Sequence, residues 1–278
     1  MIIWIASYPK SGNTYLRSFL CSYYLTKNGK FDFTLLENIK NFPGIHYSKN
    51  RSDSNLEASR NWIINQNYFF DKAKLNFLKT HNSMKLFEGN RFTTKDQTVG
   101  AIYIYRDPRN IITSLKNHYS MNYQSAFDFM KDEKNFLIHD SYDNDKSNFT
   151  YLGSWVSHYK SWFYTKDFSV MLIKYEDLQD KKFEIFLDVV KFVNSLTNKK
   201  EKINEDKLEK SIKSTNFSVL KNNERNHGFA ESVKSKISGE KISFFNLGFN
   251  NRWKKILPED LQMSMSDYFK EDLKFLKY

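Results

Sequence analysis

Cysteine is almost absent from this chain of 278 residues, in which Cys21 is the only one. A single cysteine cannot form a disulfide within the chain, and it does not supply a zinc-ligand set. Long hydrophobic runs are missing as well. The apolar run at the N-terminus lacks a basic flank and ends after about seven residues, too few for a signal peptide or a membrane span. We therefore expect a cytoplasmic protein that does not interact with a membrane.

Glycine and proline are scarce, with nine and four residues, and no repeat or low-complexity linker divides the chain. We therefore expect one domain over residues 1–278, large enough to bury a sizeable core. Acidic residues number 32 against 43 basic ones, and the resulting net charge of +11 favours anionic partners. The lysines are dispersed along the chain, so we expect a phosphate-rich small ligand and no nucleic acid.

The N-terminal apolar run leads into a loop suited to phosphate. Residues 2–8 have the β-branched and aromatic character of a buried strand, which Pro9 ends. Gly12 permits a turn, and apolar residues at helical spacing begin after Thr14. A loop between a strand and a helix directs N–H groups and the helix dipole at one point. The first glycine of a P-loop is missing, so the loop alone fits an ordinary turn equally well.

Three further strand-like runs, at 75–78, 99–105 and 168–173, also end in polar clusters. These clusters are Lys79-Thr80-His81, Arg106-Asp107-Pro108 and Tyr175-Glu176-Asp177. Helical stretches separate the runs, which predicts an α/β fold with a central, mostly parallel sheet flanked by helices, similar to P-loop proteins. Ligands of such sheets bind at the carboxyl ends of the strands. The clusters therefore predict a nucleotide pocket with two anion sites, an aromatic and carboxylate corner, and a histidine base.

Apolar spacing predicts the helices between and after these runs. Asp107 and Pro108 have the character of an N-cap and a first-turn residue. We predict helices that start at residue 14 and after residue 107, and others over 56–65, 124–135, 151–164, 180–193, 199–213 and 258–275. The aromatic face of the stretch 151–164, which contains His158, is typical of core packing.

The loop Y-P-K-S-G-N-T-Y at residues 8–15 resembles the Y-P-K-S-G-T-T-W loop of the cytosolic-type sulfotransferases. That family uses 3′-phosphoadenosine 5′-phosphosulfate (PAPS) as sulfuryl donor. The likeness continues in matching order over most of the chain. It includes K-T-H at 79–81, Y-R-D-P-R-N-I-I-T-S-L at 105–115, G-S-W-V-S-H-Y-K-S-W at 153–162, Y-E-D-L at 175–178 and S-T-N-F-S-V-L-K-N-N at 214–223.

The resemblance implies roles for individual residues. His81 would be the general base on the acceptor, Lys10 would stabilise the departing phosphate, and Lys79 would lie near the sulfuryl group. A neutral histidine suits this role, because its reference pKa is about 6.5. PAPS would be the co-substrate, adenosine 3′,5′-bisphosphate the product, and no metal would take part. The donor-binding residues would be Lys10, Ser11, Gly12, Asn13, Thr14 and Tyr15 of the loop after the first strand, Arg106 and Ser114 at the 3′-phosphate, and Tyr175, Thr215 and Phe217 at the adenine.

The stretch F-F-N-L-G-F-N-N-R-W-K at 244–254 matches the family pattern F-x-R-K-G-x-x-G-D-W-K only in part. Gly248 keeps its place, and we expect it to bind the donor. Asn246 and Leu247 stand where the family has a basic pair that clamps the 3′-phosphate. Arg252 is the donor-binding residue that we expect to compensate, and the other basic candidates are Lys241 and Lys236.

The acceptor is expected to be a small molecule with a hydroxyl or amine group. Its pocket would be lined by the connector before Leu75 and by residues 137–148. Two other functions remain open at this point. A nucleotide kinase would need a Mg²⁺ carboxylate, for which Asp177 is the candidate, and an RNA-binding protein would explain the charge and the aromatic residues. The sequence carries no signal for the oligomeric state.

Overall fold

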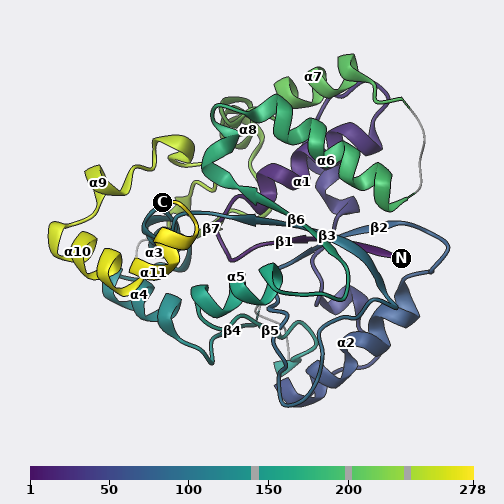
Figure 1. Ribbon diagram of the computed structural model, residues 1–278, viewed down its shortest axis with the longest axis horizontal. Coiled ribbons are helices and arrows are strands. Elements are labelled where there is room, and N and C mark those ends of the chain that lie inside the picture. Colours follow the sequence, from purple (N-terminus) through teal and green to yellow (C-terminus); the bar gives the residue numbers. More distant parts are fainter. Residues whose placement is uncertain (139–143, 198–201, 235–238) are drawn as a thin grey trace.

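A four-stranded sheet lies at the centre of the molecule, in the order β2-β1-β3-β6 (Figure 1). The computed structural model describes residues 1–138, 144–197, 202–234 and 239–278. All neighbouring strands of this sheet pair in parallel, which confirms the predicted α/β class. The strands are β1 (Ile2–Ala6), β2 (Asn76–Thr80), β3 (Thr98–Tyr105) and β6 (Ser169–Lys174).

Helices cover both faces of the sheet (Figure 1). One face is covered by α1 (Asn13–Leu25), α6 (Lys182–Leu196), α7 (Glu205–Ser214) and α8 (Phe217–His227). The other is covered by α2 (Asn55–Phe69), α3 (Pro108–Tyr119), α4 (Tyr123–Lys131), α5 (Trp155–Phe163), α10 (Glu259–Tyr268) and α11 (Lys270–Phe275). The short helices are η1 (Phe33–Asn38), η2 (Ile45–Tyr47), η4 (Tyr175–Leu178), η5 (Gly248–Asn250) and α9 (Trp253–Ile256). Two antiparallel pairs complete the described elements: β4 (Phe136–Leu137) with β5 (Thr150–Tyr151), and β7 (Val233–Lys234) with β8 (Lys241–Ile242).

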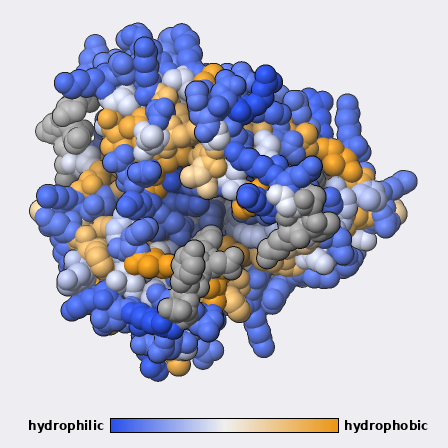
Figure 2. Space-filling view, turned by 180° about the vertical axis from the view of Figure 1, so that it is seen from behind, coloured by the Kyte–Doolittle hydropathy of each residue, from blue (hydrophilic) through white to orange (hydrophobic). Residues whose placement is uncertain are grey.

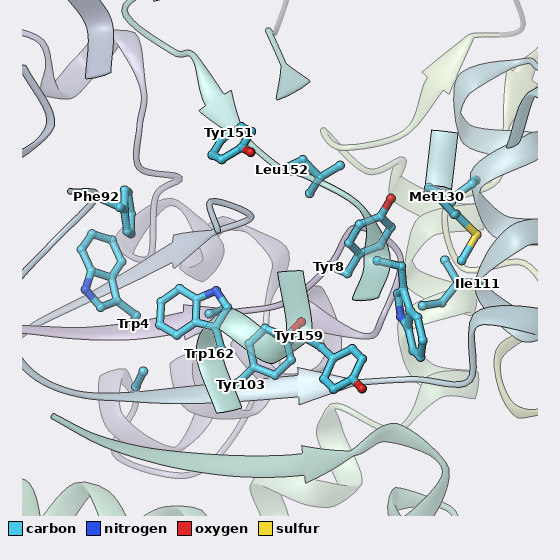
Figure 3. Packing of buried hydrophobic residues seen from close by; sticks show 14 of the residues in the cluster. Trp4, Tyr8, Phe92, Tyr103, Ile111, Met130, Tyr151, Leu152, Tyr159 and Trp162 are labelled. Carbon is cyan, nitrogen blue, oxygen red and sulfur yellow. The ribbon is translucent and has the colours of Figure 1, made fainter. Parts of the chain in front are cut away.

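Strand β1 supplies the cores on both faces, because successive side chains of a strand point in opposite directions. Ile3 and Ile5 pack under α1 and α6, whereas Trp4 packs on the opposite face. Figure 3 shows Trp4 among other aromatic rings, including Phe92. The Trp4 indole also donates a hydrogen bond of 2.8 Å to the hydroxyl of Thr98, so its polar atom is satisfied inside the core. The burial of every β1 residue explains why the run is apolar throughout.

The boundaries of two predicted helices were wrong. The stretch 151–164 begins as the end of β5, and the helix starts only at Trp155. Gly153 has a left-handed φ of +68°, and the side chain of Ser154 accepts a hydrogen bond from the backbone of Ser157 as an N-cap. The C-terminal helix predicted over 258–275 is divided at Phe269 into α10 and α11.

Other boundaries moved by smaller amounts. Helix α2 is longer than predicted, and α4 ends at Lys131 rather than near residue 135. Helix α7 begins at Glu205; of the residues predicted before it, 199–201 lie outside the described ranges. The N-cap role of Asp107 is confirmed, because its carboxylate accepts a hydrogen bond from the backbone of Arg109. Within the described ranges, no helix has both the length and the apolar character that crossing a bilayer requires.

Candidate active site

A cavity of about 350 Å³ lies at the carboxyl ends of the strands. Figure 2 shows a hollow with a largely hydrophilic floor on one face of the molecule. The sheet wall of the cavity consists of residues at or after the ends of the strands, namely 9, 10, 12–15, 79, 81, 106 and 175. The closing wall consists of Phe217 and of residues 230–233 and 244–248. The predicted site residues that line the cavity are Lys10, Gly12, Asn13, Thr14, Tyr15, Lys79, His81, Arg106, Ser114, Tyr175, Phe217 and Gly248.

The loop after β1 is held in the shape of an anion site. Gly12 has a φ of +106°, and a Cβ atom there would lie 2.5 Å from the ring of Tyr175, so no other residue fits. The side-chain amide of Asn13 donates to the carbonyl of Ile5 at 2.9 Å and to the hydroxyl of Ser7 at 3.2 Å. The loop is thereby tied to the end of its own strand. The buried hydroxyl of Ser11 has no hydrogen-bond partner among the described residues.

Lys10 carries its charge at the boundary between the two walls. Its ammonium group lies 3.9 Å from the centre of the Phe244 ring, in a cation–π contact. Burial, together with the charges of Lys79 and Arg106, lowers the pKa of Lys10 to about 7, although Glu231 and Glu224 oppose the change. A bound anion would favour the charged form and raise this pKa again.

The imidazole of His81 has a defined tautomer. Its Nδ1 atom lies 2.7 Å from the carbonyl oxygen of Ser7. A carbonyl oxygen only accepts hydrogen bonds, so Nδ1 carries the hydrogen and Nε2 carries the lone pair of the neutral ring. Because Ser7 also contacts Asn13, the histidine and the anion-binding loop share one hydrogen-bond network.

A second histidine holds the backbone of the first. His158 Nε2 lies 3.0 Å from the carbonyl of His81, and its Nδ1 lies 2.8 Å from the hydroxyl of Tyr103. Burial lowers the pKa of His158 to about 4, although its bond to the His81 carbonyl opposes that shift. The indole of Trp162 donates to the next carbonyl, that of Asn82, at 3.0 Å. His158 therefore lies behind the cavity as part of the scaffold, as the sequence predicts.

Arg106 joins the two walls. Its guanidinium donates to the carbonyl of Lys10 at 3.3 Å and to that of Gly248 at 3.2 Å, and it lies 4.4 Å from the centre of the Tyr175 ring. Its buried Nε atom has no hydrogen-bond partner in the part of the chain that the structure describes. Arg109, the second arginine of this cluster, does not line the cavity. It pairs with Asp107 at 2.8 Å and has a structural role.

Aromatic rings form one end of the cavity. Tyr175 stacks on Phe249 with the ring centres 5.0 Å apart, and Phe217 lies against Gly248, where a Cβ atom would be 2.6 Å from its ring. The resemblance places Thr215 at the adenine, but Thr215 lies outside the cavity. Thr215 ends α7, is buried, donates to the carbonyl of Ser211 at 2.7 Å and does not line the cavity.

The predicted replacement for the basic pair does not lie in the cavity. Arg252 is exposed and is not among the lining residues, and the same holds for Lys241. Lys236 lies outside the described residues. Ser11 is also absent from the lining, because it is buried beneath the loop. A small recess of about 30 Å³ adjoins Ser114. Its lining includes Lys10, Asn117, His118 and Asn246.

Three charged residues of the site were missed by sequence reasoning. Arg17 and Glu231 form a salt bridge of 2.6 Å at the cavity, and Glu224 fastens the closing wall. Burial opposes ionisation of Glu231, but Lys79 and Arg17 hold its pKa well below the ordinary value. The role of Arg17 could have been predicted from the sequence, because a lone arginine among the apolar residues of a buried helix needs an anionic partner. The role of Glu231 could not have been predicted, since it lies in a segment without helical or strand periodicity.

The kinase alternative finds no support in the position of its carboxylate. Asp177 is exposed and does not line the cavity. Among the described residues, no group of three or more histidine, cysteine or acidic side chains is arranged to hold a metal.

Comparison with known proteins identifies the family. The model of the sulfotransferase domain family matches residues 2–277. Luciferin sulfotransferase from Photinus pyralis is 24% identical over 283 residues, which cover 97% of this chain and 70% of the relative. Sulfotransferase 1E1 from Cavia porcellus is 23% identical, with coverage of 97% and 82%.

Solved structures share the fold. Retinol dehydratase in complex with androsterone and the inactive cofactor PAP superposes with a TM-score of 0.60 at 16% identity, covering 98% of this chain and 80% of that one. Mouse SULT7A1 complexed with PAP gives a TM-score of 0.56 at 18% identity, with coverage of 98% and 84%. The family match over nearly the whole chain confirms the resemblance seen in the motifs. The chain therefore belongs to the sulfotransferase family of enzymes.

Proposed function

We propose that this enzyme transfers a sulfuryl group from PAPS to a hydroxyl or amine of a small molecule. From the likeness to the cytosolic-type sulfotransferases, we also propose that it acts as one domain in the cytoplasm. The observation that carries the proposal is that His81, Lys10 and Arg106, from three different strand ends, line one cavity. Two of these groups are cations suited to an anionic donor, and the third is a base.

The residues of the cavity fit the donor in charge and shape. A nucleotide with two anionic ends needs separate anion sites, and the loop 10–14 and Arg106 meet that need. The buried Nε atom of Arg106, a residue that lines the cavity, has no protein partner in the described ranges, as expected where a ligand supplies one. The rings of Tyr175 and Phe217 suit a purine.

When bound, PAPS supplies an activated sulfuryl group on its 5′-phosphate. We propose that Lys10, Gly12 and Thr14 hold that end, with Asn13 and Ser11 supporting the loop. Ser114 and Arg106 would hold the 3′-phosphate, and Gly248 would allow the backbone to approach it. Tyr15, Tyr175 and Phe217 would surround the adenine. We no longer assign donor contacts to Thr215 and Arg252, because neither lines the cavity.

The proton of the acceptor would pass to His81. Its Nε2 lone pair accepts that proton as the acceptor oxygen or nitrogen bonds to sulfur, and the bond from sulfur to the phosphate oxygen breaks. The Nδ1–H bond to the Ser7 carbonyl stabilises the imidazolium that forms. Lys10 neutralises the negative charge on the departing phosphate oxygen, and Lys79 neutralises the charge on the sulfuryl oxygens. The products are the sulfated acceptor, adenosine 3′,5′-bisphosphate and a proton that His81 releases to solvent.

The proposal is tested by incubating the protein with PAPS labelled in the sulfuryl group and a panel of phenols, alcohols and amines. We expect labelled product without added metal, and thermal stabilisation by adenosine 3′,5′-bisphosphate. Stabilisation by ATP with Mg²⁺ and none by the bisphosphate would contradict the donor assignment. The name of luciferin sulfotransferase, and the retinol and androsterone bound in two structures of retinol dehydratase, suggest that the panel should include ring-containing and isoprenoid alcohols.

A further inference from the structure

A carboxylate of the closing wall lies in the place proposed for the 5′ end of the donor. Glu231 Oε2 accepts a hydrogen bond from the Thr14 hydroxyl at 3.0 Å and lies 3.7 Å from Lys79 Nζ. Its other oxygen, Oε1, accepts from Arg17 Nη1 at 2.6 Å. The three partners belong to α1 and β2, whereas Glu231 belongs to the segment between α8 and β7. The contact therefore crosses the cavity from one wall to the other.

The three partners form a site that selects an anion. The Arg17 side chain is only 4% exposed, and its Nη2 donates to the carbonyl of Leu36 at 3.1 Å, so the guanidinium is fixed. Its buried Nε atom has no partner among the described residues. Two cations and one hydroxyl thus converge on a single carboxylate, although burial by itself would favour the protonated acid.

We propose that Arg17, which pairs with the Glu231 carboxylate and does not itself line the cavity, becomes a further donor-binding residue when that carboxylate withdraws. Glu231 would be an internal anion that competes with the 5′ end of the donor for Thr14, Arg17 and Lys79. The proposal rests on the proposed function, which assigns Thr14 and Lys79 to that end. Two anions 4 Å apart near a protein surface repel by about 4 kcal/mol. The donor and the Glu231 carboxylate therefore cannot occupy these partners together, and the carboxylate withdraws when the donor binds.

The structure allows this withdrawal without loss of the closing wall. The residues on either side of Glu231 are held independently of it: Ser232 donates to Glu224 at 2.6 Å, and the ring of Phe229 packs on that of Phe33. The Glu231 side chain itself is 29% exposed and lines the cavity. A rotation of one side chain is therefore enough to exchange the protein anion for the ligand.

The exchange sets the donor affinity and assists product release. A site that is open for only a fraction of the time binds its ligand more weakly by that fraction. The same carboxylate replaces the 5′-phosphate of the product when it leaves, so the cations are never left unpaired. Removing the charge of Glu231 should therefore tighten binding, which is the opposite of what removing a ligand-binding residue does.

The test measures the affinity for adenosine 3′,5′-bisphosphate by calorimetric titration. We expect Glu231→Gln to bind roughly tenfold more tightly than the unsubstituted protein. Glu209→Gln, which removes the same charge from an exposed pair on α7, should leave the affinity unchanged. Unchanged or weaker binding by Glu231→Gln would overturn the competition while leaving the proposed function intact. Glu231→Ala replaces the glutamine variant if that variant does not fold.

The role of Arg17 is measured in the Glu231→Gln background, where the salt bridge no longer contributes. There Arg17→Gln should weaken bisphosphate binding roughly tenfold. No further change would mean that Arg17 only pairs with Glu231, and would overturn its assignment. If no variant binds the bisphosphate, the proposed function fails. Inorganic pyrophosphate then becomes the probe, and equal binding by the unsubstituted and Glu231→Gln proteins would overturn the anion site as well.

Discussion

The two walls of the cavity are built in different ways. Residues of the sheet wall lie at or just after the ends of parallel strands, where backbone hydrogen bonds still hold the chain. Ser7, which leads from β1 into the loop, donates from its backbone to the carbonyl of Thr80. In the closing wall, one side chain accepts four hydrogen bonds. Glu224 accepts hydrogen bonds from the hydroxyls of Ser232 and Ser243 and from the backbone of Phe244 and Phe245. The sheet wall thus holds His81 and the anion-binding loop in fixed positions, whereas the closing wall can change its conformation locally.

The largest effect is expected on the sheet wall, at His81. His81→Ala should lower kcat roughly 10²–10⁴-fold, because the acceptor proton loses its base. The affinity for adenosine 3′,5′-bisphosphate should change less than about twofold, since positioning and charge at the donor are intact. Labelled sulfate transfer and calorimetric titration measure the two quantities. His46→Ala is the matched control, because His46 is exposed and does not line the cavity. A variant at position 81 that keeps full activity would refute the proposed base.

The next effect compares an arginine of the sheet wall with one beyond the closing wall. Arg106→Gln should weaken bisphosphate binding roughly 30-fold, equivalent to about 2 kcal/mol for a lost charge-assisted hydrogen bond. Arg252→Gln should change it less than about twofold, because Arg252 is exposed away from the cavity. The two affinities are compared by calorimetric titration of both variants with the bisphosphate at the same salt concentration. Equal losses at the two positions would restore Arg252 as a clamp on the 3′-phosphate.

A smaller effect concerns Lys10, where the two walls meet. Its pKa of about 7 means that binding an anion above neutral pH takes up a proton. The affinity for the bisphosphate should therefore fall as the pH rises from 7 to 8, by up to about tenfold for one proton. Lys79, whose pKa burial also lowers, contributes in the same direction. Lys10→Met should reduce the slope, and a slope equal to that of the unsubstituted protein would contradict the assignment to Lys10.

The smallest effect should come from loosening the closing wall. Glu224→Ala removes the acceptor of four hydrogen bonds, so hydrogen exchange should quicken in peptides that cover residues 228–234 and 241–248. We expect about a threefold loss of bisphosphate affinity and a Tm lower by about 3–6 °C, from a cost of about 1–2 kcal/mol. Glu209→Ala is the exposed control. Equally fast exchange in the loop 9–15 would show that the two walls do not differ in this way.

The sheet wall could be predicted from the sequence because its residues follow strands that local patterns reveal. The apolar runs, Pro9 and Asp107 mark strand ends and a helix start by chemistry that acts over a few residues. Parallel strands then bring those ends together, whatever the intervening connectors contain. This is why His81 and Arg106 were placed at one cavity without any knowledge of the loops between them.

The closing wall could not be predicted, because long-range contacts decide its conformation. Arg252 has the charge of a clamp, but the segment from Gly248 onward packs through Asn251 and Trp253 on Asn110 of α3, and Arg252 is left exposed. Thr215 was expected at the adenine, but it caps the end of α7 and does not reach the cavity. The pairing of Glu231 with Arg17 joins residues 214 positions apart and leaves no local pattern.

A crystal structure with adenosine 3′,5′-bisphosphate tests the central claim most directly. We predict the 5′-phosphate on the loop 10–14, the 3′-phosphate beside Arg106 and Ser114, the imidazole of His81 facing the 5′ end, and the Glu231 carboxylate withdrawn from Thr14. A nucleotide bound outside this cavity, or bound within it with its 5′-phosphate remote from Lys10 and His81, would contradict the account.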